Sequence, residues 1–132
     1  MHETAEDLQA LQAILDRSFA RAGTHLRSVF RNKAPMSSSD VAATLRSAFV
    51  LHLATVSNST HHPFVAPIDG FLLHGRLLFS MVDDSVRARH LRRWPPVSAS
   101  YADANGACVI AHGRAVEVDS TLSHVRTFFE EI

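Results

Sequence analysis

Apolar residues recur at spacings of three and four through the first thirty positions, which is the pattern of an amphipathic helix. The stripe consists of Leu8, Leu11, Ile14, Leu15, Phe19, Ala22, Leu26, Val29 and Phe30. Lys33-Ala34-Pro35 interrupts it, because proline cannot continue a helix. Residues 37–40 then offer capping oxygens for a second, shorter helix that we expect to end near Ala48. The pattern predicts an N-terminal helical extension over residues 1–48, packed on the domain's own core or on a partner subunit.

From residue 49 the pattern changes to runs of β-branched and aromatic residues bounded by turn residues. The expected strands cover residues 49–56, 63–73, 76–81, 97–102 and 107–118, with a short helix at 85–93 and a last helix starting at 119. Short connections favour antiparallel pairing. The predicted class is therefore α+β, a small antiparallel barrel of about five to six strands with flanking helices.

Two local signals refine this sheet. Pro63 and Pro67 fall in the second strand, and each lacks an amide donor, so we expect a sheet edge or a broken ladder there. His74-Gly75 lies between two apolar runs and predicts a tight hairpin turn.

Composition and charge narrow the class of protein. The 132 residues suit one domain, and 13 basic against 13 acidic residues give no net charge. We therefore expect no nucleic-acid partner and no membrane attachment. The single cysteine, Cys108, excludes an intrachain disulfide, and its place within a strand predicts a buried structural thiol. With neither a signal-peptide pattern nor an apolar run of ~20 residues, we expect a cytoplasmic protein.

Five arginines fall within residues 76–93, in a chain that is otherwise balanced. A helix start in this segment offers unpaired N–H groups and a partial positive charge, both of which attract anions. Ser85 adds a hydroxyl, and Arg87 adds a guanidinium that can grip a phosphate. The alternative is a solvated helix face neutralised by Asp83 and Asp84.

Six short patterns occur in order between residues 49 and 118. They are Leu53-Ala54-Thr55-Val56, Pro63-Phe64-Val65-Ala66-Pro67, Leu77-Leu78-Phe79-Ser80, Ser85-x-Arg87-Ala88-Arg89-x-Leu91, Pro96-Val97-Ser98-Ala99-Ser100 and Gly113-x-Ala115-x-x-Val118. Together they resemble the pyridoxamine 5′-phosphate oxidase-like, FMN-binding split-barrel family. The resemblance implies a split β-barrel domain over residues 49–132 and a homodimer with two flavin sites at the subunit interface.

The same resemblance implies where the cofactor lies. Its phosphate would contact Ser85 and Arg87, and its ring would follow the second and third strands. The implied cofactor-binding residues are Ala66, Pro67, Ile68, Ser80, Met81, Ser85 and Arg87. Two departures stand out: Met81 occupies a position where the family often has a small hydroxyl residue, and the second strand lacks the basic residues of relatives that oxidise pyridoxamine phosphate.

Many members of the family continue beyond the fifth strand into a further helix and a closing strand. Here the sequence stops at Ile132. Two explanations stay open: the long N-terminal helix completes the core, or the sequence is a piece of a longer chain.

The implied function is a flavin-dependent oxidoreductase that binds FMN and passes a hydride to or from a small organic substrate. Flavin chemistry needs no dedicated catalytic side chain, and the sequence singles none out. Alternatives on the same fold are a reductase that uses a deazaflavin coenzyme (F-420 type) and a non-catalytic flavin- or haem-binding module. The nine histidines show no metal-ligand spacing such as H-E-x-x-H, so we expect no metal site.

The remaining polar residues divide by position. His90, on the arginine-rich helix, is a candidate for a role near the cofactor. His52 and His112 lie on expected strands and are interpreted as hydrogen-bonded packing residues. Arg92 and Arg93 lie more than a turn beyond Arg87, so we expect them at the surface rather than on the phosphate.

Overall fold

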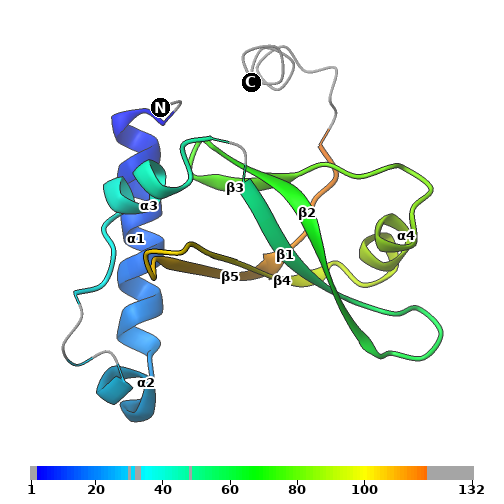
Figure 1. The fold of residues 1–132 in the computed structure, drawn as a ribbon, viewed down its shortest axis with the longest axis horizontal. Helices are drawn as coiled ribbons and strands as arrows, with labels where there is room; N and C mark the ends of the chain where they lie inside the picture. Colours follow the sequence, from blue (N-terminus) through cyan, green and yellow to red (C-terminus); the bar gives the residue numbers. More distant parts are fainter. Residues whose placement is uncertain (1–2, 30, 32–33, 48, 119–132) are drawn as a thin grey trace. The chain divides into compact units, whose positions relative to one another are not determined.

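The computed structural model of the protein describes residues 3–29, 31, 34–47 and 49–118. Its elements are α1 (Ala5–Arg21), α2 (Thr24–Val29), α3 (Ser38–Thr44), β1 (Phe49–Val56), β2 (Pro63–Leu73), β3 (Arg76–Phe79), α4 (Val86–Arg93), β4 (Pro96–Ala102) and β5 (Cys108–Arg114) (Figure 1). The predicted α+β class is confirmed. The last helix expected from residue 119 lies outside the described residues. Within them, no helix combines the length and the apolar character needed to cross a bilayer.

Two compact units make up the chain. The first comprises Met1–Arg46 and Phe71–Leu78, and the second comprises Ser47–Gly70 and Phe79–Ile132. The three N-terminal helices and the tip of the β2–β3 hairpin therefore belong to the first unit. The second unit holds β1, β4, β5, α4 and the N-terminal part of β2.

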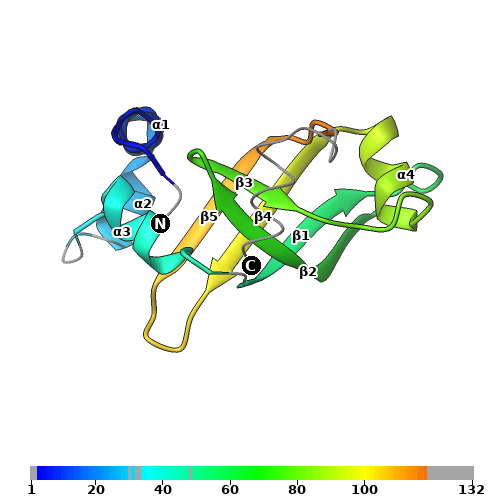
Figure 2. The ribbon, with the colours of Figure 1, turned by 90° about the horizontal axis from the view of Figure 1, so that it is seen from above.

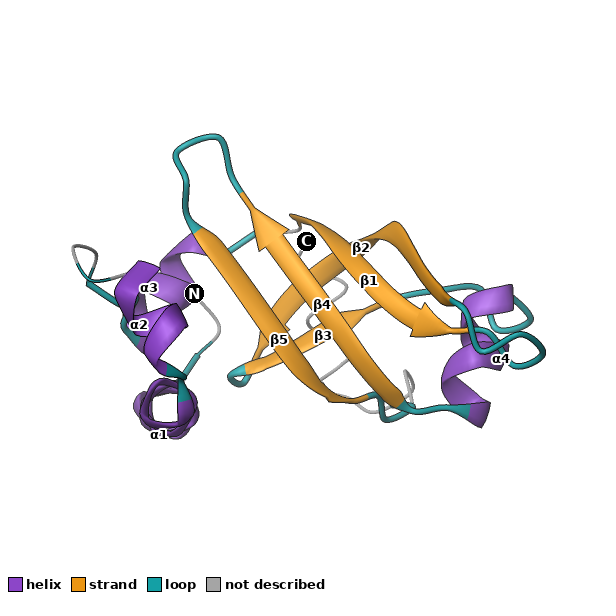
Figure 3. Ribbon diagram, turned by 90° about the horizontal axis from the view of Figure 1, so that it is seen from below, coloured by secondary structure: helices purple, strands orange, loops and turns teal. Residues whose placement is uncertain are grey.

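The strands form one antiparallel sheet in the order β3-β2-β1-β4-β5, curled as a half-barrel (Figure 3). β1 pairs with β2 from Phe49↔Gly70 to Val56↔Pro63. β1 also pairs with β4, where Leu53 lies opposite Ala99, and β4 pairs with β5 along its full length. The short connections between neighbouring strands account for the antiparallel arrangement.

The two prolines of β2 do not break its ladder. Pro63 and Pro67 both lie in the continuous register with β1, opposite Val56 and His52. The four residues of β3 follow directly on a tight hairpin turn, so they lie along the C-terminal end of β2 only. Among the described residues, the prolines therefore occupy a part of β2 whose single neighbouring strand is β1, where a missing amide donor is tolerated.

Alternation along β1 builds the core of the second unit. Leu51, Leu53 and Thr55 are at most 2% exposed, whereas the alternate residues Val50 and His52 face outward. Leu51 and Leu53 pack in one apolar cluster with residues from the neighbouring elements, namely Ile68, Leu91 and Ala99. This cluster holds β2, β4 and α4 against β1. It therefore fixes the positions of the polar residues that β2 and α4 carry.

The first unit begins with a capping box. The Thr4 hydroxyl accepts a hydrogen bond from the Asp7 N–H, and the Asp7 carboxylate accepts one from the Thr4 N–H. The predicted apolar stripe is divided into α1 and α2, because the chain becomes extended at Ala22 next to Gly23. α1 and α3 lie side by side (Figure 2).

The second predicted helix starts where expected and stops early. Ser37 and Asp40 form a capping box at the start of α3. The helix ends at Thr44 rather than near Ala48. Its first N–H, that of Ser38, donates to the side-chain oxygen of Gln12 on α1 at 2.8 Å.

The predicted hairpin turn at His74-Gly75 is confirmed. Both residues have positive φ, 50° and 67°, as a tight two-residue turn requires. His74 Nδ1 lies 2.9 Å from the Asp7 carboxylate, and a side chain at Gly75 would stand 3.2 Å from the Asp7 carbonyl oxygen. The hairpin tip is therefore joined to the first turn of α1 within this unit.

This contact gives the first unit a predicted pH dependence. The hydrogen bond from His74, helped by Thr4, lowers the pKa of Asp7 to about 2. Because its folded pKa lies below the unfolded value of 3.8, Asp7 stabilises the fold above about pH 4, and this contribution is lost as the pH falls toward about 2. Asp7→Asn should therefore lower the melting temperature at neutral pH, and the difference from wild type should shrink between about pH 4 and about pH 2.

Thermal unfolding followed by circular dichroism measures both chains across this range. Glu6→Gln is the matched control, because it removes a carboxylate from the same helical turn without touching His74. A gap between Asp7→Asn and wild type that stays constant down to pH 2 would contradict the prediction.

Candidate functional site

The loop from residue 80 to residue 85 joins β3 to α4 and carries several of the predicted site residues. Ser80 and Met81 were expected on the third strand, but β3 ends at Phe79, so both lie in this loop instead. Ser85 is the N-cap of α4, and its hydroxyl accepts a hydrogen bond from the Ala88 N–H at 3.1 Å. The predicted helix start at Ser85 is confirmed.

The first turn of α4 has backbone N–H donors without a partner among the described residues. The N–H groups of Ala88 and Arg89 are bonded to the hydroxyl and the carbonyl of Ser85. Among the described residues, the N–H groups of Val86 and Arg87 have no such partner. Free N–H groups at a helix start, on the positive end of the helix dipole, favour an anion.

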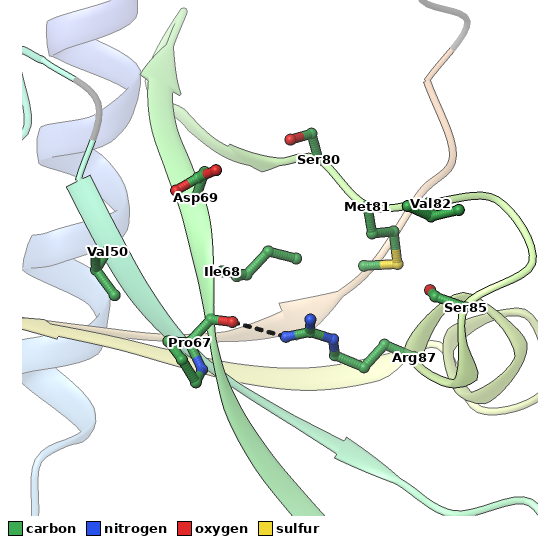
Figure 4. A pocket seen from close by; sticks show the side chains of 9 residues that line it. All are labelled: Val50, Pro67, Ile68, Asp69, Ser80, Met81, Val82, Ser85 and Arg87. Atoms are coloured by element: carbon green, nitrogen blue, oxygen red, sulfur yellow. Dashed lines mark hydrogen bonds between the residues drawn. The ribbon is translucent and has the colours of Figure 1, made fainter.

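A pocket of about 380 Å³ lies between this loop, β2 and the start of α4 (Figure 4). Its lining residues are Val50, Pro67, Ile68, Asp69, Ser80, Met81, Val82, Ser85 and Arg87, all in the second unit. Six of the seven residues predicted to bind cofactor are therefore brought together. The exception is Ala66, which lies opposite Leu53 in the β1–β2 ladder. The volume falls in the range of small-molecule sites.

Arg87 reaches from α4 to β2. Its guanidinium donates a hydrogen bond to the carbonyl oxygen of Pro67 at 2.8 Å (Figure 4). Because a guanidinium carries several N–H donors, this bond fixes the side chain at the pocket and leaves other donors for an anion. Ser85 and Arg87 thus form one polar end of the pocket, next to the free N–H groups of α4.

Asp69, Val50 and Val82 complete the lining and were not predicted from the sequence. Strand alternation could have found the first two, because residues two apart share a face of a strand. Asp69 follows Pro67 by two positions on β2, and Val50 is its partner on β1. Val82 lies in the β3–α4 loop, where no periodic signal exists.

An ion-pair network around Arg92 holds the loop. Its guanidinium donates to the carbonyl oxygen of Asp83 at 2.8 Å, to the Asp83 carboxylate, and to Glu117 Oε1 at 2.9 Å. Hydrogen bonding from Arg92 lowers the pKa of the Glu117 carboxyl, and the bonds to Glu117 and Asp83 raise the pKa of Arg92. Arg92 is exposed, as expected of a surface residue, but it also ties the loop to the chain beyond β5.

His90 lies away from the pocket. It is buried, its Nδ1 lies 3.1 Å from the Thr55 hydroxyl, and its ring packs against Phe64 with centroids 5.4 Å apart. It is not among the residues that line the pocket. The geometry makes His90 a packing residue that joins α4 to β1 and β2.

Other polar residues lie on the outward face of the sheet. His112 is hydrogen-bonded to the Ser98 hydroxyl at 2.8 Å, as expected, whereas His52 is exposed and has no hydrogen bond among the described residues. The prediction of a buried thiol is wrong, because Cys108 is exposed. It shares the outward face of β5 with Ile110 and His112, since residues two apart point the same way. The described residues contain no cluster of three potential metal ligands.

The comparisons with known proteins bear on the fold. No protein-family model and no curated protein matches the sequence. A conserved hypothetical protein from Mycobacterium tuberculosis has 24% identity and a TM-score of 0.56, covering 64% of this chain and 54% of that one. A protein of unknown function from Agrobacterium tumefaciens has 19% identity and a TM-score of 0.58, covering 71% of this chain and 44% of that one.

A third solved structure, 27% identical with a TM-score of 0.51, covers 58% of this chain and 66% of that one. The chain therefore spans about half to two thirds of the length of these structures. The neighbours share a curled antiparallel half-barrel sheet, which is compatible with a split-barrel fold.

Proposed function

We propose that this pocket binds FMN and that the protein is a flavin-dependent oxidoreductase related to pyridoxamine 5′-phosphate oxidase. It would transfer a hydride to or from a small organic substrate. One observation carries the proposal: six of the seven residues that the family resemblance assigns to the cofactor line a single pocket.

The phosphate of FMN fits the polar end of the pocket. Ser85 can donate its hydroxyl proton while its oxygen caps the helix, and Arg87 supplies a fixed cation. The N–H groups of Val86 and Arg87 have no partner among the described residues. Charge-assisted hydrogen bonds of this kind are stronger than neutral ones. Asp83 and Asp84, which precede the helix, repel a phosphate less than the sequence suggests, because Asp83 forms an ion pair with Arg92.

The flavin ring fits the apolar part of the pocket. Ile68, Met81 and Val82 supply apolar surface, and the Ser80 hydroxyl can hydrogen-bond to a heteroatom of the ring. When bound, the flavin supplies the hydride chemistry. The residues of the chain bind it, orient it and exclude water from one of its sides.

Two alternatives keep the same pocket. A deazaflavin coenzyme (F-420 type) combines a tricyclic ring with a phosphate-bearing tail, so it would use the same polar end. A non-catalytic flavin-binding module is favoured by Met81, which replaces a hydroxyl that many relatives carry near the ring. Haem is a poorer candidate, because none of the described residues that line the pocket is a histidine that could bind the iron.

We also propose a homodimer. Val50, Val65 and Ile110 are each more than half exposed, and the strand register places them on the same outward face of the sheet. An apolar strand face of this kind is a candidate for contact with a second copy of the chain.

A cytoplasmic setting fits the single cysteine, which cannot form an intrachain disulfide.

The proposed activity is tested on the purified protein. After incubation with FMN and removal of excess cofactor, the protein should retain the yellow flavin absorbance, and NADH or NADPH should bleach it without oxygen. Bleaching that depends on the protein supports an oxidoreductase, whereas retained but unreactive flavin supports the binding module. A protein that stays colourless, and whose melting temperature does not rise with FMN, would refute the flavin site.

A further inference from the structure

Asp69 gives the pocket a second polar end. It lines the pocket from β2, one residue beyond Ile68. In Figure 4, the Asp69 carboxylate and the Arg87 guanidinium lie on opposite sides of Ile68. The carboxylate is therefore separated from the guanidinium of the phosphate end, and Asp69 lines the same pocket as the residues that the proposed function gives to the ring.

The charge of Asp69 is not neutralised by the described residues. The ion pairs among the described residues of the second unit join Arg92 to Asp83 and to Glu117, and none of them involves Asp69. Arg87, the cation that shares the pocket, is instead bonded to the Pro67 carbonyl. Ser80 and Ser85, the remaining polar side chains of the lining, carry no charge. A ligand at this end therefore meets an uncompensated negative charge.

Tricyclic cofactors differ in the charge of their rings. Oxidised FMN has a neutral ring, with its negative charge on the phosphate. An 8-hydroxy-5-deazaflavin, the ring type of F-420, is a phenol that loses its proton near neutral pH and spreads the negative charge over the ring. A carboxylate near the ring repels the second type and not the first.

On the basis of the proposed function, we infer that Asp69 is a specificity-determining residue, which makes the pocket select a neutral flavin ring over an anionic deazaflavin ring. The phosphate end binds either tail, because it contacts only the phosphate. The choice between the cofactors is then made at the other end, by charge.

The test compares two ligands with the same tail, FMN and 8-hydroxy-5-deazariboflavin 5′-phosphate. Their dissociation constants are measured at pH 8 for the wild type, for Asp69→Asn and for Glu6→Gln. Asn keeps the size of the side chain and removes the charge. Glu6→Gln is the matched control, because it removes one negative charge from an exposed residue outside the pocket.

The wild type should bind FMN more tightly than the deazaflavin phosphate. Asp69→Asn should reduce this preference by about three- to tenfold, as expected for one partly screened charge near the ring, and Glu6→Gln should leave it unchanged. Because Asp69 is exposed, raising the salt concentration should also narrow the wild-type preference. This last measurement needs no variant, so it holds even if Asp69→Asn folds poorly.

Two failures can be told apart. If the wild type binds FMN but binds the anionic ring equally well, or if Asp69→Asn and salt leave the preference unchanged, the inference is wrong and the flavin site stands. If the wild type binds neither ligand, the proposed function fails and the inference fails with it.

Discussion

Replacing Arg87 with alanine is expected to weaken FMN binding by about tenfold to a hundredfold, the value of a charge-assisted hydrogen bond to phosphate. Riboflavin, which has the same ring but no phosphate, should bind the variant almost as well as the wild type. The reason is positional: the Arg87 side chain is held beside Ser85 and the free N–H groups of α4, at the polar end of the pocket. Fluorescence titration with the two ligands measures the difference.

Arg89→Ala is the matched control for this experiment. Arg89 lies on the same helix, but its guanidinium donates to the Asp84 carbonyl oxygen and it does not line the pocket. Its loss should leave both affinities nearly unchanged. If Arg87→Ala weakened riboflavin as much as FMN, Arg87 would act through its bond to Pro67 and the shape of the pocket, not through the phosphate.

Replacing Leu53 with alanine is expected to lower the free energy of unfolding by about 2–5 kcal/mol. Leu53 is 0% exposed and packs within the apolar cluster that joins β1 to β2, β4 and α4. The substitution removes apolar contacts and leaves a cavity that the neighbouring strands cannot fully close. Urea denaturation followed by circular dichroism gives the difference, and the slope with urea should stay constant.

Val116→Ala serves as its control, because Val116 is also apolar but is 80% exposed and lies beyond β5, off the sheet face proposed for the dimer. Its truncation should cost less than about 0.5 kcal/mol, which is usual for surface sites. Equal losses at the two positions would show that the loss at Leu53 does not come from its burial. A loss below 1 kcal/mol at Leu53 would contradict the core described here.

The strands were predictable because apolar and polar side chains alternate along them and turn-forming residues such as Gly75 mark where they end. β1 and β2 have the predicted bounds, and the turn at His74-Gly75 lies where its glycine indicated. β5 covers Cys108–Arg114 rather than the predicted residues 107–118. The bounds of the helices were harder to predict than those of the strands. The apolar stripe continues through Ala22 and Gly23, so periodicity alone could not locate the break between α1 and α2.

The pocket was predictable only in part. The position of Ser85 at a helix start can be derived from the sequence, since a hydroxyl residue before a polar helix is a typical N-cap. The residues on β2 came from the family resemblance. Asp69 was missed because a single carboxylate near a strand end belongs to no sequence motif. Only the structure shows that it lines the same pocket as Pro67 and Ser80.

For the arginines, too, the sequence did not reveal contacts between residues that lie far apart along the chain. Helical spacing separated Arg92 from the phosphate end, but it could not show that Asp83 and Glu117 converge on it, because these residues lie in different parts of the sequence. The exposure of Cys108 was missed for a similar reason. A strand sequence gives the alternation of its side chains, and the packing of the whole sheet decides which face is covered.

The central claim is that this pocket holds FMN by its phosphate, and calorimetric titration of the apoprotein with FMN tests it most directly. The account predicts saturable binding of one FMN per chain, with riboflavin bound markedly more weakly by the wild type. Absence of saturable heat with FMN, or equal affinity for FMN and riboflavin, would contradict it.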